Sequence, residues 1–231
     1  MSGEASERTP AGEPSPEAPA HGDLLRDEVH HPEVTASEVV FHGAVWDIRR
    51  ETFDLPEAHG LVRDMMDHTG AVGVACVDEQ ERILLIKQYR HPVRARLWEV
   101  PAGLLDVAGE DPLAAAQREL AEEADLRAAR WEVLSDSCLS PGGSSESIRL
   151  YLARDLEPVA EEDLHVRSDE EAGLEFRWVS IDEALAAIAA GALTNAAAQL
   201  AILQVATVLR CEAEGRTAPT RPADAPRLLI D

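Results

Sequence analysis

The sequence predicts an α/β fold in which a compact mixed sheet is covered by helices. Short runs rich in Val, Ile and Leu alternate with turn signals through most of the chain, a pattern typical of strands. A few segments instead have helical spacing and begin at residues that favour helix starts. No repeat period is evident in the sequence, which argues against solenoids and propellers.

Short β-type runs make up most of the predicted sheet. The first two, Glu38 to Ile48 and Arg50 to Leu55, are expected to form a small N-terminal β unit. Two apolar runs, Ala71 to Val77 and Arg82 to Gln88, flank a polar tetrapeptide and are expected to pair as a hairpin. Three more strands are expected at Arg130 to Ser135, Ile148 to Ala153 and Glu175 to Val179.

Two helices are expected toward the C-terminus. The first begins at Ser180, with Glu183 three residues later in the arrangement of a capping box, and ends at Gly191. The second runs from about Thr194 to Arg210 and carries apolar side chains at helical spacing. Both helices are expected to cover the sheet.

The two ends of the chain differ from its middle. Residues 1–33 are acidic and Pro-rich and cannot bury enough apolar surface to offset chain entropy, so we expect disorder there. Residues 213–231 are again rich in Pro and Ala, and we expect a loose tail. The folded domain is therefore expected at residues 34–212, with the N-terminal β unit at residues 34–68.

Composition excludes some classes of function. The 231 residues include 44 acidic and 21 basic side chains, which gives a net charge of −23, and so negative a surface repels nucleic acid. No apolar run approaches the roughly 20 residues of a membrane span, and the first residues lack the pattern of a secretory signal. Three cysteines at wide spacings fit neither a disulfide framework nor a zinc site. We expect a cytoplasmic protein without nucleic-acid or membrane partners.

One further predicted helix carries side chains that could take part in metal binding or catalysis. Asp111 is a preferred N-cap and Pro112 a preferred first helical residue, and the helix is expected to end near Ala124. Three of its glutamates, related by i+3 and i+4 steps, share a sector about 100° wide. They are Glu119, Glu122 and Glu123. The neighbouring sector is apolar and is expected to pack on the sheet.

Two interpretations of the acidic face are open at this point. Like charges at i and i+4 repel by a few tenths of a kcal/mol, a cost that a bound cation would remove. Mg²⁺ is bound through a few carboxylates, with water and substrate phosphate completing its coordination. Alternatively the face is simply solvated, with Arg118 bridging to Glu122 as an i+4 pair.

The residues around this helix resemble the signature of the Nudix hydrolase family, in which a Gly and a Glu precede Arg-Glu-x-x-Glu-Glu and a small closing turn. The matching positions are Gly103, Glu110, Arg118, Glu119, Leu120, Glu122, Glu123 and Leu126. Two features depart from the pattern: six residues instead of five separate Gly103 from Glu110, and Asp125 replaces the usual Gly. Loops tolerate an extra residue, and Asp tolerates the left-handed conformation expected there. The resemblance implies a Nudix-type α/β/α sandwich around a mixed sheet.

The resemblance also implies roles for individual residues. Glu119 and Glu123 would be the main metal ligands, Glu122 a further ligand and catalytic group, and the backbone carbonyl of Ala102 a fourth oxygen donor. The metal would be two or three Mg²⁺ ions, with Mn²⁺ also possible. Signature-loop support would come from Gly103, Glu110 and Arg118.

Flanking segments resemble the ADP-ribose pyrophosphatase branch of the family. These are Lys87 to Arg90, Leu97 to Gly103 and Ser140 to Glu146. In that branch a glutamate on the loop after the signature helix acts as base toward the attacking water, and Glu146 is the matching residue. The alternative for Glu146 is an ordinary turn with one exposed acid. The acidic run Asp169 to Glu171 could instead supply the base or another metal contact, or form a solvated loop.

Substrate contacts follow from the same resemblance. Arg90 would contact phosphate, and Glu99 would lie near the metal cluster. Trp46 and Arg50 would help to hold adenine, in a stretch that crosses between subunits in dimeric members. Core packing for Trp46 and a surface ion pair for Arg50 remain open. A homodimer is expected.

The implied reaction is metal-dependent hydrolysis of a nucleoside diphosphate linked to another moiety, above all of ADP-ribose to AMP and ribose 5-phosphate. Within the family, the alternative is a different nucleotide sugar or an oxidised nucleotide. From another class, the alternative is a non-catalytic regulator that binds a nucleotide.

Overall fold

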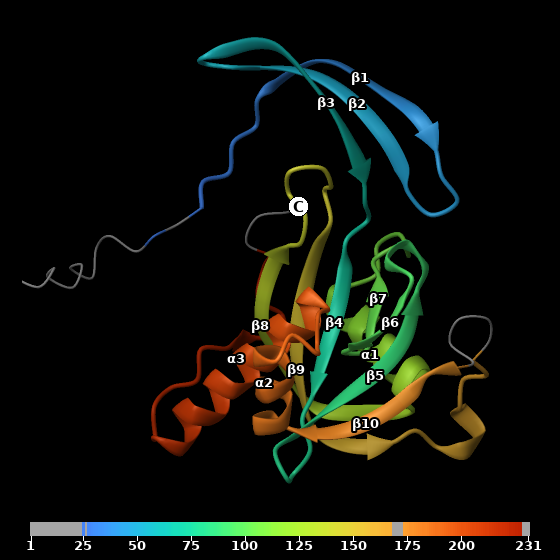
Figure 1. The fold of residues 1–231 in the computed structure, drawn as a ribbon, viewed down its shortest axis with the longest axis vertical. Coiled ribbons are helices and arrows are strands. Elements are labelled where there is room, and N and C mark those ends of the chain that lie inside the picture. The colour runs from blue at the N-terminus through green and yellow to red at the C-terminus, as the bar shows by residue number, and fades with distance from the viewer. Residues whose placement is uncertain (1–24, 26, 168–172, 228–231) are drawn as a thin grey trace, which may run out of the picture. The chain divides into compact units, whose positions relative to one another are not determined.

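The central sheet has five strands in the order β11-β8-β9-β4-β7 (Figure 1). The protein is seen here in a computed structural model, which describes residues 25, 27–167 and 173–227. β4 and β9 are parallel and the other pairs are antiparallel, so the sheet is mixed as predicted. The strands are β4 (Ala71–Cys76), β7 (Ala102–Leu104), β8 (Leu126–Cys138), β9 (Ser147–Pro158) and β11 (Arg221–Pro222).

Helices cover both faces of this sheet (Figure 1). Successive side chains of β4 point to opposite faces, so Val72 and Val74 pack with α1 (Pro112–Ala124) on one side. Ala71 and Ala75 pack on the other side with α2 (Ile181–Ala189) and α3 (Ala196–Ala213). The predicted α/β/α sandwich is confirmed.

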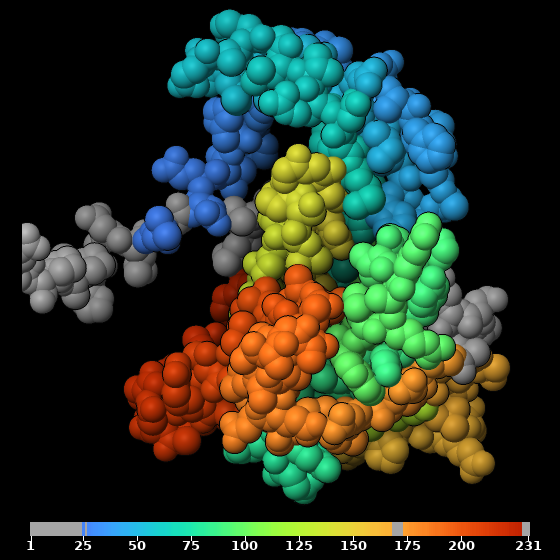
Figure 2. Space-filling model, in the orientation of Figure 1, coloured from blue at the N-terminus to red at the C-terminus, as the bar shows by residue number. Residues whose placement is uncertain are grey.

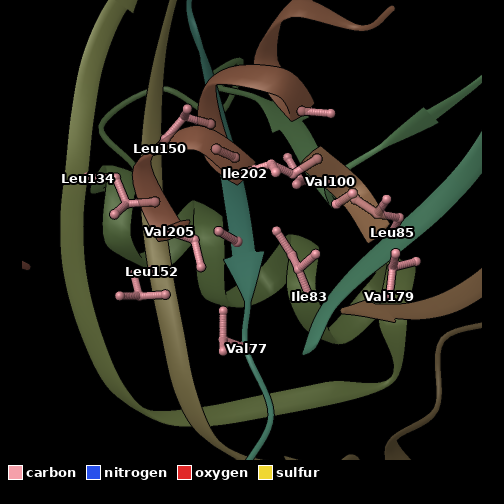
Figure 3. Packing of buried hydrophobic residues seen from close by; sticks show 14 of the residues in the cluster. Val77, Ile83, Leu85, Val100, Leu134, Leu150, Leu152, Val179, Ile202 and Val205 are labelled. Atoms are coloured by element: carbon pink, nitrogen blue, oxygen red, sulfur yellow. The ribbon is translucent and has the colours of Figure 1, made fainter. Parts of the chain in front are cut away.

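The face under α3 holds the larger of the two clusters of buried side chains. Ile202 and Val205 of α3 lie over Leu150 and Leu152 of β9 (Figure 3). The length and mean hydropathy of α3 would suffice for a membrane span. In the fold, one side of α3, which includes Ile202 and Val205, is buried against the sheet, whereas Leu203 is 48% exposed.

A second sheet has three strands in the order β10-β5-β6. Its strands are β5 (Arg82–Arg90), β6 (Ala95–Glu99) and β10 (Glu175–Ser180), and short 3₁₀ helices occur at His91–Val93 and Glu161–Asp163. The prediction that β4 and β5 form a hairpin is wrong: the two segments share one isolated bridge, between Val77 and Ile83. The strands diverge because β4 pairs with β7 and β9, whereas β5 pairs with β6 and β10.

The N-terminal unit is a three-stranded antiparallel sheet of β1 (Glu33–His42), β2 (Asp47–Leu55) and β3 (Ala58–Asp67). The single strand expected from 38 to 48 is interrupted, because the chain turns between β1 and β2. A Cβ at Gly43 would lie 2.1 Å from the carbonyl oxygen of Trp46, so this turn requires glycine. β3 was not predicted; β3 pairs with β2 and leads directly into β4.

The helix starts follow the predicted capping in part. Asp111 accepts hydrogen bonds from two backbone N–H groups of the first turn of α1, at 2.9 and 3.4 Å. Ser180 accepts a bond from the N–H of Glu183, but the Glu183 carboxylate accepts a bond from Arg177, so the second half of the predicted capping box is absent. α3 begins after Asn195, whose side chain accepts a bond from a first-turn N–H.

The expectation of a loose C-terminal tail does not hold for residues 220–227. β11 pairs with β8, and Arg221 donates to Asp136 at 2.7 Å. Arg149 donates to both carboxylate oxygens of Asp136 and to the carbonyl of Ala225. Burial raises the pKa of Asp136, but the hydrogen bonds from Arg149 and Arg221 outweigh it and hold that pKa below its ordinary value. The tail is ordered because it completes this buried ionic group.

The expected disorder of residues 1–33 falls mostly outside the described residues, as does the acidic run Asp169 to Glu171.

Candidate active site

A cavity of about 700 Å³ opens where the N-terminal sheet, the signature loop (residues 101–111) and the β8–β9 loop (residues 139–146) meet. Its lining includes Ala102 and Gly103 of β7 and several polar and aromatic side chains, for most of which the sequence predicted a role. They include Trp46, His68, Arg90, Glu99 and Glu146. The cavity thus gathers residues from segments that are far apart in the sequence.

Two glutamates of α1 lie against β7 beside this cavity. The carboxylate of Glu123 accepts a hydrogen bond from the backbone N–H of Ala102 at 2.8 Å, and the residue is 5% exposed. A Cβ at Gly103 would lie 2.0 Å from the carboxylate carbon of Glu119. Only glycine therefore allows Glu119 to lie so close to the β7 backbone. The i+4 spacing on α1 brings both carboxylates to the same short strand.

Arg118 braces the signature loop against α1. Its Nε and Nη2 donate to the two oxygens of Glu110 at 3.1 and 3.0 Å, which lowers the pKa of Glu110. Its Nη1 donates to Glu119 at 2.6 Å and to Glu122 at 3.3 Å. The ion pair between Arg118 and Glu122, which was expected for a solvated acidic face, is therefore present. The same guanidinium also holds the signature loop through Glu110, and it holds Glu119.

The donor set suits a divalent cation. Glutamate carboxylates lie around the signature loop, those of Glu99, Glu110, Glu119, Glu122 and Glu123; Arg90 pairs with the first of them, and Arg118 pairs with the next three. Carboxylate oxygens are the donors that hard divalent cations prefer. Across the described ranges, no group of three or more His, Cys, Asp or Glu side chains is placed so that it could hold a metal ion. The glutamates are instead held by Arg118 and by the Ala102 N–H.

Asp125, the departure from the family's glycine, is accommodated at the end of α1. It adopts the left-handed conformation, with φ of 54°, and its N–H donates to the carbonyl of Leu120. Its carboxylate pairs with Arg167, whose Nε donates to the carbonyl of Glu122 at 3.2 Å. The aspartate thus pairs with an arginine that caps the C-terminal end of α1.

Arg90 and Glu99 form one bidentate pair at the cavity, with distances of 3.0 and 2.7 Å. The Glu99 side chain is 5% exposed, whereas that of Arg90 is 41% exposed. Because Glu99 is buried beneath it, the guanidinium is held in one orientation with an exposed face toward the cavity.

Trp46 and Arg50, expected to share a role at adenine, lie in different environments. Trp46 lines the cavity and is 39% exposed, with its ring packed edge-on against His68 at 5.6 Å between centroids. Arg50 makes a bidentate pair with Asp64 on the neighbouring strand, at 2.7 and 2.8 Å. Arg50 is not among the residues that line the cavity. Within one chain it forms a surface ion pair, which was the alternative to a contact with adenine.

Glu146 lies at the cavity with its side chain 27% exposed. His68 faces it: the imidazole is 3% exposed, and its Nε2 is 4.0 Å from a carboxylate oxygen of Glu146. The sequence did not single out His68, because a lone histidine after a strand carries no spacing signal. Only the approach of two segments 77 residues apart places it here.

Comparisons with known proteins give this arrangement a context. Residues 67–200 match the family model of the NUDIX domain. An ADP-ribose pyrophosphatase of Mycobacterium tuberculosis (strain ATCC 25618 / H37Rv) is 39% identical over 197 residues, which cover 85% of this chain and 94% of the relative. One of Bacillus subtilis (strain 168) is 35% identical over 150 residues, covering 65% and 79%. A crystal structure described as an ADP compounds hydrolase shares the fold, with a TM-score of 0.67, 20% identity and coverage of 83% of this chain and 100% of that one.

Proposed function

This chain belongs to the Nudix family, and from that premise we propose that it is a pyrophosphohydrolase that converts ADP-ribose and water to AMP and ribose 5-phosphate. One observation carries the proposal: Glu119 and Glu123 lie together against β7, and the cavity bordered by that strand also holds Glu146. The names of the similar relatives, both ADP-ribose pyrophosphatases, support the choice of substrate.

Nudix enzymes generally use divalent metals, and the carboxylates around the signature loop fit such ions. We assign two or three Mg²⁺ ions, or Mn²⁺, to Glu119, Glu122, Glu123 and the carbonyl of Ala102. When bound, the metal would neutralise the diphosphate and lower the pKa of the attacking water. Arg118, Glu110 and Gly103 hold the ligands and the loop in place.

The remaining residues act on the substrate and the water. Glu146 accepts the proton of the attacking water. Arg90, oriented by Glu99, offers its guanidinium to a phosphate oxygen. Trp46 provides an aromatic wall on which the adenine stacks.

A second copy of this chain is the proposed partner. A small sheet gains stability by packing an apolar face against another surface, yet the N-terminal sheet exposes apolar side chains such as Val40, Phe41 and Val62. In a homodimer these would be buried, and Arg50 could approach the partner's substrate, as its proposed role requires. Sedimentation equilibrium measures this directly: a mass near 50 kDa supports the dimer, and one near the 25.1 kDa of a single chain contradicts it.

The cytoplasm is the proposed compartment. All three cysteines, Cys76, Cys138 and Cys211, are free, and Cys138 is exposed. Exposed thiols persist in a reducing compartment.

The decisive experiment is the release of AMP from a panel of ADP-ribose, ADP-glucose, NADH and diadenosine compounds. Mg²⁺ or Mn²⁺ would be present in one series and a chelator in the other. We expect AMP from ADP-ribose with metal and none with chelator. Preferential hydrolysis of another compound would reassign the substrate within the family. Binding of nucleotides without any hydrolysis would instead identify a regulator.

A further inference from the structure

We propose that His68 is a positioning residue for Glu146: its imidazole N–H holds the carboxylate in the orientation in which it accepts a proton from water. The inference rests on the proposed function, in which Glu146 is the base. His68 lies outside the signature loop and α1, in the turn that joins β3 to β4. Its imidazole is 3% exposed, and Nε2 faces a Glu146 oxygen at 4.0 Å.

A backbone hydrogen bond fixes the tautomer of His68. The N–H of Gly70 donates to Nδ1 at 2.9 Å. A backbone N–H can only donate, so Nδ1 must present its lone pair and the neutral ring carries its proton on Nε2. The left-handed backbone at Gly70, with φ of 89°, makes this tight turn possible. The donor of the imidazole is therefore the nitrogen that faces Glu146.

The main chains around both residues are held in register. The N–H of His68 donates to the hydroxyl of Ser145 at 2.8 Å, and the N–H of Ser145 donates to the carbonyl of Met66 at 3.0 Å. Met66 in turn donates to the carbonyl of Gly143 at 2.9 Å. In Figure 2 the β8–β9 loop lies beside the end of β3. The position of Glu146 relative to His68 is thus set by the backbone of both segments.

The ring itself has little freedom to turn away from Glu146. Trp46 packs edge-on against it at 5.6 Å, and Gly70 anchors its opposite nitrogen. A separation of 4.0 Å exceeds hydrogen-bond length, but contacts in a catalytic site tighten when substrate binds.

Two substitutions at His68 distinguish the roles of its two ring nitrogens. In His68→Asn the amide can still accept from the N–H of Gly70, but no donor reaches Glu146. In His68→Gln the longer side chain places an amide N–H near the position of Nε2. We expect His68→Asn to lower kcat roughly 10- to 100-fold, the range for groups that orient a catalytic residue, with KM within about twofold. His68→Gln should restore most of kcat. The control, His165→Asn at an exposed position, should leave kcat unchanged.

The decisive measurement combines His68→Asn with Glu146→Gln. If His68 acts through Glu146, His68→Asn will not lower kcat further once Glu146 is neutral. An equal loss in both backgrounds, or a rise in KM with unchanged kcat, overturns the positioning role. If His68→Asn fails to fold in a thermal melt, the His68→Gln variant decides, and its inactivity while folded overturns the proposal. Wild-type kcat in Glu146→Gln alone would instead refute the proposed base, so the two failures are distinguishable.

Discussion

The two walls of the cavity are built in different ways. The wall formed by β7 is local: Glu119 and Glu123, the proposed metal ligands that lie against it, are one helical turn apart, and the strand they contact is 21 residues away in the sequence at most. The wall that carries Glu146 is assembled over long range, because Ser145 is held by a segment 77 residues earlier. Helical periodicity puts Glu119 and Glu123 on the same face of α1, whereas the second arrangement exists only in the folded chain.

The largest loss of activity is expected on the local wall. Glu119→Gln combined with Glu123→Gln removes two negative charges from the proposed metal site but keeps an amide oxygen at position 123 that can accept the Ala102 N–H. Metal catalysis contributes several kcal/mol, so we expect kcat/KM to fall on the order of 10⁴-fold at unchanged fold. Steady-state AMP release and isothermal titration with Mn²⁺ would measure activity and metal uptake.

A charge-matched control uses two exposed glutamates of the same chain. Glu161→Gln combined with Glu162→Gln removes the same charge from a surface 3₁₀ helix. This variant should keep wild-type activity and metal affinity. Undiminished Mn²⁺ binding in the variant of α1 would show that the acidic face is merely solvated.

A smaller effect is expected from adding one methyl group to each wall. In Gly103→Ala the new Cβ would overlap the Glu119 carboxylate, at 2.0 Å, and must displace it from β7. Overpacking of this kind costs about 1–3 kcal/mol of stability, and we expect activity to fall roughly 10- to 100-fold. In Gly142→Ala, on the β8–β9 loop, the Cβ meets nothing within 4 Å.

The comparison of these two alanine variants is read from kcat/KM at saturating Mg²⁺ and from thermal melts. Gly142→Ala should match the wild type in both. Equal activity of the two variants would mean that close packing of α1 on β7 does not matter for the site.

The features that the sequence predicts are the local ones, and those that it misses depend on contacts between distant segments. The N-cap at Asp111 and the acidic face of α1 were predictable, because each depends on residues close together in the chain. The mixed sheet covered by helices followed from the strand and helix patterns, and its arrangement as a sandwich was expected from the resemblance to the Nudix family. The partners of β4 and β5 were not predictable from the tight turn between them, since other strands compete for their edges. His68 was missed because its role depends on the docking of a distant loop.

The C-terminal tail illustrates a third limit, which is that composition does not reveal buried charges. Nothing in its Pro-rich sequence indicates that Asp136 and Arg149, with side chains 10% and 4% exposed, need Arg221 and the Ala225 carbonyl to complete their hydrogen bonds. Segments that satisfy buried polar groups are ordered whatever their composition. Arg227 extends this anchoring to Ser147, next to Glu146, at 2.7 Å.

The smallest effect on activity, but a clear one on stability, is therefore expected at Asp136. Asp136→Asn leaves Arg149 buried without its counter-charge, and breaking a buried pair in this way should lower the free energy of unfolding by about 3 kcal/mol. The matched control Asp155→Asn affects an exposed pair with Arg130 at 3.7 Å and should change the free energy of unfolding by less than about 1 kcal/mol. Urea unfolding at neutral pH measures both.

The same pair predicts how stability depends on pH. Because the folded protein holds the pKa of Asp136 below its ordinary value of 3.8, its unfolded state binds the proton first as the pH falls. The stabilisation is thus complete above that value and is lost as the pH drops through and below it. The difference in unfolding free energy between wild type and Asp136→Asn should be constant near neutral pH and shrink below pH 3.8. A difference that stayed constant down to strongly acidic pH would mean that the asparagine acts through packing and not through the lost charge, and that the tail is held by its backbone contacts instead.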